Sequence, residues 1–162
     1  MGLYFFGYFI EIELMLRILI AGICGGMLGF ERKQRKKEAG VRTHVIVAMN
    51  AALVMIVSKY GFFDILSYDS VGLDPSRMAS NVVTGMSFLG AGVIFVKNVS
   101  VRGLTTAAGL WATAGIGLAV GAGMYEIGIF SSVLILGIQF VLHNHLSVFD
   151  STIKDLVTIT FE

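Results

Sequence analysis

The chain has 162 residues, of which 56% are hydrophobic and only 14% charged, and its mean hydropathy is +0.81. Together with long uncharged runs, this composition excludes an ordinary soluble domain and predicts a membrane protein with several spans. The net charge is only +1, so the distribution of charge along the chain carries more information than its sum. The single cysteine, Cys24, excludes a disulfide within the chain.

The N-terminal segment, residues 1–10, is apolar and aromatic, but a bilayer span needs about 20 residues. We therefore expect it to lie at the membrane interface. Glu11 and Glu13 stand where a signal peptide would be basic, which argues against a cleaved leader. The first span is predicted from about Ile12 or Leu14 to Phe30.

An arginine and a set of glycines stand out in this first span. Arg17 follows Glu13 by four residues, the spacing of a helical ion pair. Arg17 either extends to the nearby interface beside Glu13, or makes a buried polar contact with another helix. Overlapping GxxxG pairs permit close helix approach and leave a face that a homodimer could use. These pairs are Gly22 with Gly26 and Gly25 with Gly29.

Charge in the next two loops predicts the orientation. Residues 31–42 hold half of all Lys and Arg, so this loop should be cytoplasmic. The second span covers about Thr43 to Val57 or Phe63, and the acidic loop 59–77 should face outward. The third span opens with Asp74 as helix cap and Pro75 at the first helical position.

The stretch from Met78 to Val120 contains the third and fourth spans, joined by a tight turn with Lys97 and Arg102. Small residues crowd both spans, including Gly90 and Gly92 on the third. On the fourth they form two stripes at every fourth position, which predicts packing on two sides and a central place in the bundle for spans three and four. The stripes are Thr105, Gly109, Thr113, Gly117 and Gly121, and Trp111, Gly115, Ala119 and Gly123.

The fifth span is predicted from about Ile127 to Leu142, followed by a cytoplasmic tail with His143, His145 and Lys154. Nine of the twelve basic residues are then cytoplasmic. We predict an all-α bundle of five transmembrane helices, N-terminus out and C-terminus cytoplasmic. The transmembrane domain covers residues 1–146 and the tail covers 147–162.

The end of the tail, Leu156 to Phe161, alternates apolar and polar residues as a strand does. A lone strand is not stable by itself, so it pairs with a partner chain or begins a domain that a longer chain would complete.

Three motifs resemble the MgtC/SapB family of bacterial inner-membrane proteins: GGMLGFERKQRKKEAGVRTH, DPSRMASNVVTGMSFLGAGVIF and VRGLTTAAGLWATAGIGLAVGAG. The resemblance covers about Gly22 to Tyr125. Departures are Ser87 where Gly is usual, Gly109 where Thr is common, and Ser80-Asn81 where Ala-Gln is common. Longer members carry a cytoplasmic ACT-like domain, of which the tail resembles the first strand.

The resemblance implies a virulence-associated role in magnesium homeostasis and adaptation to low magnesium. It also implies partners among other membrane proteins, such as P-type ATPases or the ATP synthase, in the bacterial inner membrane. We expect a regulatory or accessory protein that needs no cofactor and binds no nucleic acid. The alternative is a small transporter of magnesium or another ion. A nucleophile–base pair, phosphate loop or zinc spacing is missing from the sequence, so we expect no enzyme activity.

The candidate functional residues are polar groups near the span ends. Arg32 suits a helix C-terminus, whereas Glu31 needs a cationic partner, for which Arg42 or Arg102 is the candidate unless the loop is solvated. Arg77, Asn81 and Thr84 form a polar face on the third span. Asp74 is a cap in a structural network, or a weak magnesium ligand. The full predicted network is Glu31, Arg32, Arg42, Thr43, Asp74, Arg77, Asn81, Thr84, Arg102, Thr105 and Thr106.

Overall fold

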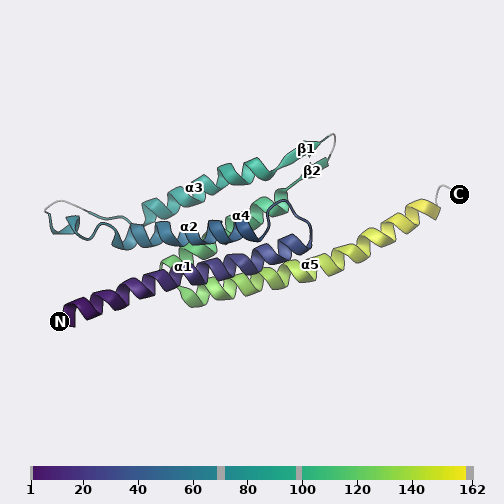
Figure 1. Ribbon diagram of the computed structural model, residues 1–162. Helices are drawn as coiled ribbons and strands as arrows, with labels where there is room; N and C mark the ends of the chain where they lie inside the picture. The colour runs from purple at the N-terminus through teal and green to yellow at the C-terminus, as the bar shows by residue number, and fades with distance from the viewer. Residues whose placement is uncertain (1, 69–71, 98–99, 160–162) are drawn as a thin grey trace. The chain divides into compact units, whose positions relative to one another are not determined.

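A computed structural model of the chain describes residues 2–68, 72–97 and 100–159 (Figure 1). Its elements are α1 (Gly2–Gln34), α2 (Val41–Tyr60), a 3-10 turn (Ile65–Ser67), α3 (Ser76–Val93), β1 (Phe95–Lys97), β2 (Ser100–Arg102), α4 (Leu104–Gly121) and α5 (Tyr125–Ile159). The predicted interfacial segment is part of α1, which continues without a break into the first span.

Within the described residues, four segments are long and apolar enough to cross a membrane: Ile10–Gln34, Val41–Tyr60, Leu104–Gly121 and Tyr125–Leu142. The prediction of a helical protein with several spans is therefore confirmed. The third predicted span, α3, is not among the four, because its Ser, Asn and Arg residues lower its hydropathy. The five-span count and the orientation of the termini stay predictions.

The chain divides into two compact parts, Met1–Ser132 and Val133–Glu162. The first part contains α1 to α4 and the first turns of α5. The second part is helical up to Ile159, so Leu156–Ile159 form helix where a strand was expected. The remaining expected strand residues, 160–161, lie outside the described residues, and the proposed ACT-like continuation stays a prediction.

Helix α4 is the centre of the first part, since it packs against α1, α2 and α3. The prediction that helices three and four share the centre is only half right. Of α3, only Met86 and Gly90 are buried, and its remaining residues are half-buried or exposed. Helix α2 occupies the second central place, between α1 and α4.

Glycines on α4 bring its backbone against α2. A Cβ atom on Gly117 would lie 2.3 Å from the Ala48 carbonyl oxygen, and one on Gly121 would lie 2.5 Å from that of Ala52. The first small-residue stripe is thus buried against α2, except Thr105 at its start. The second stripe does not pack as predicted. Trp111 is 55% exposed, and a Cβ atom on Gly115 would meet nothing within 4 Å.

The GxxxG glycines of α1 pack against α2 in the same way. A Cβ atom on Gly25 would lie 2.5 Å from the His44 carbonyl oxygen, and one on Gly29 would lie 2.6 Å from the Val41 Cα. Gly22 faces the Met49 side chain at 3.0 Å. The α1 face that was predicted to be spare is therefore occupied by α2.

Helix α3 begins one residue later than expected, with Pro75 rather than Asp74 at the cap position, but the Asp74 side chain still bonds to the first helical residue. The Asp74 Oδ1 accepts hydrogen bonds from the Ser76 backbone N–H at 3.0 Å and from its hydroxyl at 2.6 Å. Pro75 immediately precedes the first helical residue. Its carbonyl accepts a hydrogen bond from the Ser58 hydroxyl, so the start of α3 is joined to the end of α2.

The predicted turn between α3 and α4 is an antiparallel β-hairpin. Its residue pairs are Phe95 with Arg102, Val96 with Val101, and Lys97 with Ser100. Gly103 then adopts φ +90°, where a Cβ atom would lie 2.1 Å from the Val93 carbonyl oxygen. Only glycine fits this left-handed position, which turns the chain directly into α4.

Candidate functional site

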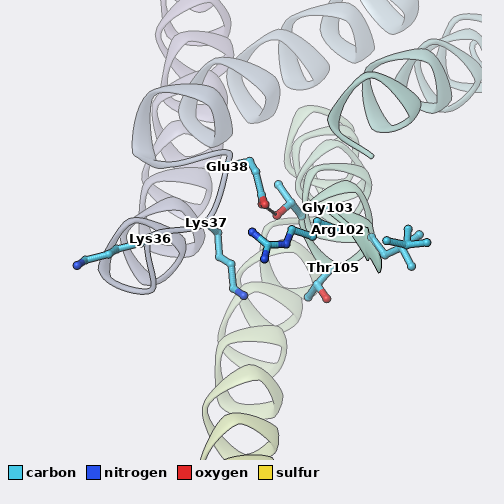
Figure 2. A pocket seen from close by; sticks show the side chains of 9 residues that line it. Lys36, Lys37, Glu38, Arg102, Gly103 and Thr105 are labelled. Carbon is cyan, nitrogen blue, oxygen red and sulfur yellow. Dashed lines mark hydrogen bonds between the residues drawn. The ribbon is translucent and has the colours of Figure 1, made fainter. Parts of the chain in front are cut away.

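A basic hollow of about 450 Å³ lies where the α1–α2 loop meets the start of α4 (Figure 2). Figure 2 shows Arg102 and Lys37 near Glu38, whereas Lys36 points away from the other labelled side chains. The residues that line the hollow are Lys36, Lys37, Glu38, Val101, Arg102, Gly103, Leu104, Thr105 and Thr106. Of the predicted network, the hollow brings together Arg102, Thr105 and Thr106.

The loop is held to α4 by one hydrogen bond. The buried Thr106 hydroxyl donates to the Glu38 Oε2 at 2.7 Å. This bond holds the pKa of the Glu38 carboxyl below its usual value, and the positive charges of Lys37 and Arg102 lower that pKa further. Glu38 was missed from the sequence because a lone acid in a basic loop looks like part of a solvated surface.

The other side of the hollow is the N-terminus of α4. No side chain caps this helix at Gly103, and free backbone N–H groups at a helix start carry partial positive charge. With Lys37 and Arg102 beside it, the hollow favours a negatively charged group such as a carboxylate or phosphate. Glu38 is the negative group of this chain that already lies there.

The Glu38–Thr106 contact predicts a pH-dependent stability difference. Because the folded pKa of Glu38 is lowered, its stabilising effect is present above the unfolded pKa of about 4.3 and is lost as pH falls through the folded pKa. Thr106→Val should therefore lower the melting temperature at neutral pH, and the difference from wild type should disappear at low pH. Thermal unfolding in detergent across a pH series measures this difference.

The matched control is Thr105→Val, since Thr105 is exposed beside Thr106. It should change the melting temperature little at any pH. A destabilisation by Thr106→Val that stays constant with pH would contradict the role of the Glu38 charge.

Glu31 pairs with Arg32 and Arg35, so the predicted partners Arg42 and Arg102 are wrong. Arg35 follows Glu31 by four residues on α1, so both ion-pair partners of Glu31 come from its own helix and not from α2 or α4. Arg32 is buried, at 4% exposure. Arg42 and the neighbouring Thr43 are exposed and line a separate hollow at the start of α2.

His44 is buried beside this end of the bundle, at 1% exposure. Its Nδ1 lies 2.9 Å from the Gly40 carbonyl oxygen. Its Nε2 has no hydrogen-bond partner among the described residues and faces Gly109, whose missing side chain leaves room for the ring. Within the described part of the chain, no three His, Cys, Asp or Glu side chains gather as a metal site would require.

Arg17 is the centre of a polar cluster at the opposite end of the bundle. It is 6% exposed and contacts other helices, so the predicted buried polar contact is confirmed, and the predicted pair with Glu13 is present as well. Its position relative to the membrane interface stays a prediction. Its guanidinium donates to the Glu13 carboxylate at 2.6 Å, the Tyr125 hydroxyl at 3.1 Å, the Tyr60 hydroxyl at 3.2 Å and the Gly121 carbonyl at 3.0 Å. It thereby joins α1, α2, α4 and α5.

Sequence reasoning predicted Glu13 as a partner of Arg17 but missed its partners on other helices. Tyr60 lies near the end of the predicted second span and Tyr125 just before the predicted fifth, where tyrosine is an ordinary interface residue, so neither suggested a buried contact. Lys59 was also missed. Its ammonium donates to the Ala122 carbonyl at 2.7 Å and joins the ends of α2 and α4 beside the Arg17 cluster.

The predicted polar face of α3 exists, but it is exposed and faces no other part of the chain's first unit. Asn81 and Thr84 are exposed, and Arg77 lies 3.8 Å from Asp74 as a loose ion pair. One Asp74 oxygen is already used by Ser76, whose hydrogen bonds lower the pKa of the Asp74 carboxyl. The Asp74 network is thus the structural one that was predicted. Of the α3 glycines, Gly90 packs on Ala107, whereas Gly92 is open.

Comparisons with known proteins give one consistent result. A model of the MgtC family matches residues 18–147. The chain is 56% identical over 131 residues to the Escherichia coli K12 protein named "Putative magnesium transporter YhiD", which covers 81% of this chain and 61% of that protein. It is 35% identical over 130 residues to Protein SapB of Bacillus subtilis, covering 80% and 56%.

Protein MgtC of Brucella abortus is 40% identical over 122 residues, covering 75% of this chain and 48% of that protein. The chain thus spans roughly half to three-fifths of the length of these curated relatives. No solved structure matches it.

Proposed function

The chain belongs to the MgtC family, and from this premise we propose that it is an accessory protein of the bacterial inner membrane. It acts without catalysis on other membrane proteins and serves magnesium homeostasis. The name of the Escherichia coli relative supports the link to magnesium. Their greater length means that a part of the whole protein's activity can reside outside the matched region.

The observation that carries this proposal is the closed interior of the bundle. Gly25 on α1 and Gly117 on α4 both bring their helices against α2 at the distance of backbone contact. The buried polar side chains between them are Thr106, His44 and Thr113, and Thr113 bonds to the backbone of its own helix. The close contacts of α2 with α1 and α4 leave no room for a hydrated ion. Binding of partner proteins at the surface is therefore better supported than ion conduction through the bundle.

The five-span topology is part of the proposal, and the position of α3 supports it. Ser58 joins the end of α2 to the start of α3, and Gly90 packs against Ala107 near the start of α4. Helix α3 therefore runs along α4 at the same depth. If α4 crosses the bilayer, α3 crosses it too. The proposed orientation, with the N-terminus outside and the tail in the cytoplasm, depends on the basic residues of loop 31–42.

The basic hollow gives a partner a binding place on the proposed cytoplasmic side. Arg102, Lys37 and the start of α4 suit an acidic segment of a membrane ATPase or of the ATP synthase, the partners that the family resemblance implies. The Glu38 carboxylate would be displaced by such a segment.

Ion transport is the second candidate. The exposed polar face of α3, with Asn81 and Thr84, and the name of the Escherichia coli relative favour it.

Co-reconstitution with purified ATP synthase in vesicles that contain a magnesium-sensitive dye tests both candidates. We expect the wild type to change the rate of ATP hydrolysis, and uptake of magnesium to match that of protein-free vesicles. The double variant Lys37→Ala, Arg102→Ala should lose the effect on hydrolysis, whereas Lys36→Ala should keep it. Magnesium uptake that Asn81→Leu abolishes would replace the accessory role with transport.

A further inference from the structure

Five exposed residues of α3 form one straight seam on the side away from α4. Their spacing alternates between four and three residues, and buried Met86 and Gly90 lie on the opposite side of the helix. Phe88 is 81% exposed and the Arg77 side chain 85% exposed, among the highest values on the described surface. The seam consists of Arg77, Asn81, Thr84, Phe88 and Ala91.

The alternating spacing is that of the a and d positions in a two-stranded coiled coil, with Asn81 and Phe88 at a and the other three residues at d. A single Asn at an a position fixes the register of a parallel pair, because its amide is both donor and acceptor. Two copies inserted in one membrane with the same topology present their α3 helices in parallel. We propose that two copies of this chain pair through the α3 seam about a two-fold axis.

The seam needs a polar cover if α3 crosses the bilayer, a step that rests on the five-span topology proposed above. Asn81 makes no hydrogen bond within the described part of the chain, whereas Thr84 donates to the Ser80 carbonyl at 3.1 Å. Lipid tails offer no partner to an amide, and helices in membranes associate through such side chains. An identical Asn81 across a two-fold axis supplies both a donor and an acceptor.

Charge at the outer end of the seam is also self-complementary. The Asp74 Oδ2 lies 3.8 Å from the Arg77 Nε, while its Oδ1 is held by Ser76. Both side chains remain largely exposed, with Asp74 at 57%. Across a two-fold axis, Arg77 of each copy can pair with Asp74 of the other, which makes two intermolecular ion pairs from two loose intramolecular ones.

Space beside the seam permits close approach. Cβ atoms on Gly85 and Gly92 would meet nothing within 4 Å, and the two glycines are seven residues apart, so one flank of the seam is open along two turns. The GxxxG face of α1 is filled by α2. The α3 seam is exposed, and it combines an amide that is unpaired among the described residues with self-complementary charge, which a second copy fits.

Disulfide cross-linking in native membranes tests the seam. The buried Cys24 is first replaced by Ala, and single cysteines are introduced as Thr84→Cys in the seam and Leu89→Cys outside it. Both positions are exposed on the same helix, so they form a matched pair. A disulfide needs Cα atoms within about 7 Å, so Thr84→Cys should give about tenfold more linked dimer than Leu89→Cys.

A second measurement uses energy transfer between labelled copies in vesicles. Asn81→Leu should weaken pairing by about threefold to tenfold, whereas Asn81→Gln, which keeps the amide, should weaken it less. Equal cross-linking at the two cysteine positions, or pairing unchanged in Asn81→Leu, would overturn the seam.

Failure of the seam is distinguished from failure of the topology by labelling Thr84→Cys with a membrane-impermeant maleimide. If the cysteine is neither labelled nor cross-linked, pairing through the seam is wrong but α3 lies in the bilayer. If the cysteine is labelled and not cross-linked, both the pairing and the five-span topology are wrong.

Discussion

Replacing Gly117 with leucine is expected to destabilise the protein by about 3 kcal/mol, the upper range for overpacking a tight interface. A Cβ atom at this position would lie 2.3 Å from the Ala48 carbonyl oxygen and 2.8 Å from the Ala51 Cβ. Backbone cannot move aside as a flexible side chain can, so α2 and α4 must separate. The free energy of unfolding in mixed micelles measures the loss.

Gly115→Leu is the control for this substitution. It adds the same side chain to the same helix two residues away, where a Cβ atom would meet nothing within 4 Å. We expect a change within about 0.5 kcal/mol, as for an open surface position. Equal destabilisation by the two variants would contradict the α2–α4 contact as the cause, since leucine is a better helix former than glycine and does not lower stability through helix propensity.

Gly117 and Gly115 also show which part of the packing could be predicted from the sequence. Spacing predicted a helix with two small-residue faces, and both stripes exist. Only the Gly117 stripe is covered, because only that side of α4 meets α2. A period of four residues says that a helix can pack closely on a face, but it does not say which of two such faces has a neighbour.

The candidate site was likewise predicted only in part. Arg102, Thr105 and Thr106, three members of the predicted network that are neighbours in the sequence, line one hollow with residues of the basic loop. The pairing of Glu31 was wrong because a local arginine, Arg35, lies on the same helix face and needs no long-range contact. When a loop carries many charges, a cation four residues away on the same helix is therefore a better candidate for an ion pair than a cation on another helix.

Helix α3 is the opposite case, in which a predicted polar face was correct but its position was not. Its polar residues Arg77, Asn81 and Thr84 looked like part of a central helix, since polar groups in a membrane normally face the protein interior. The structure places them on the outside of a single chain. Polar groups in a membrane normally face the protein interior, yet these side chains are exposed on a single chain. The proposed α3 seam explains both observations, because pairing of two copies buries these side chains in the interface between them.

Arg17→Ala is expected to destabilise the protein by about 3 kcal/mol, at the lower end of the range for breaking a buried ion pair. Glu13 is 47% exposed, so water can still solvate its carboxylate when Arg17 is removed. The Gly121 carbonyl is buried and loses its guanidinium donor. The three other helices that meet at Arg17 lose a common contact.

Arg17→Lys distinguishes the network from a simple charge. An ammonium has no planar fork and cannot donate at once to Glu13, Tyr125 and the Gly121 carbonyl, so we expect Lys to recover only a minor part of the lost stability. Lys36→Ala, which removes an exposed cation, is the control and should be neutral. Unfolding in mixed micelles gives all three values on one scale. Full stability in Arg17→Lys would mean that the ion pair with Glu13 is the part of the cluster that stabilises the protein. The hydrogen bonds to α2, α4 and α5 would then be consequences of helix packing rather than its cause.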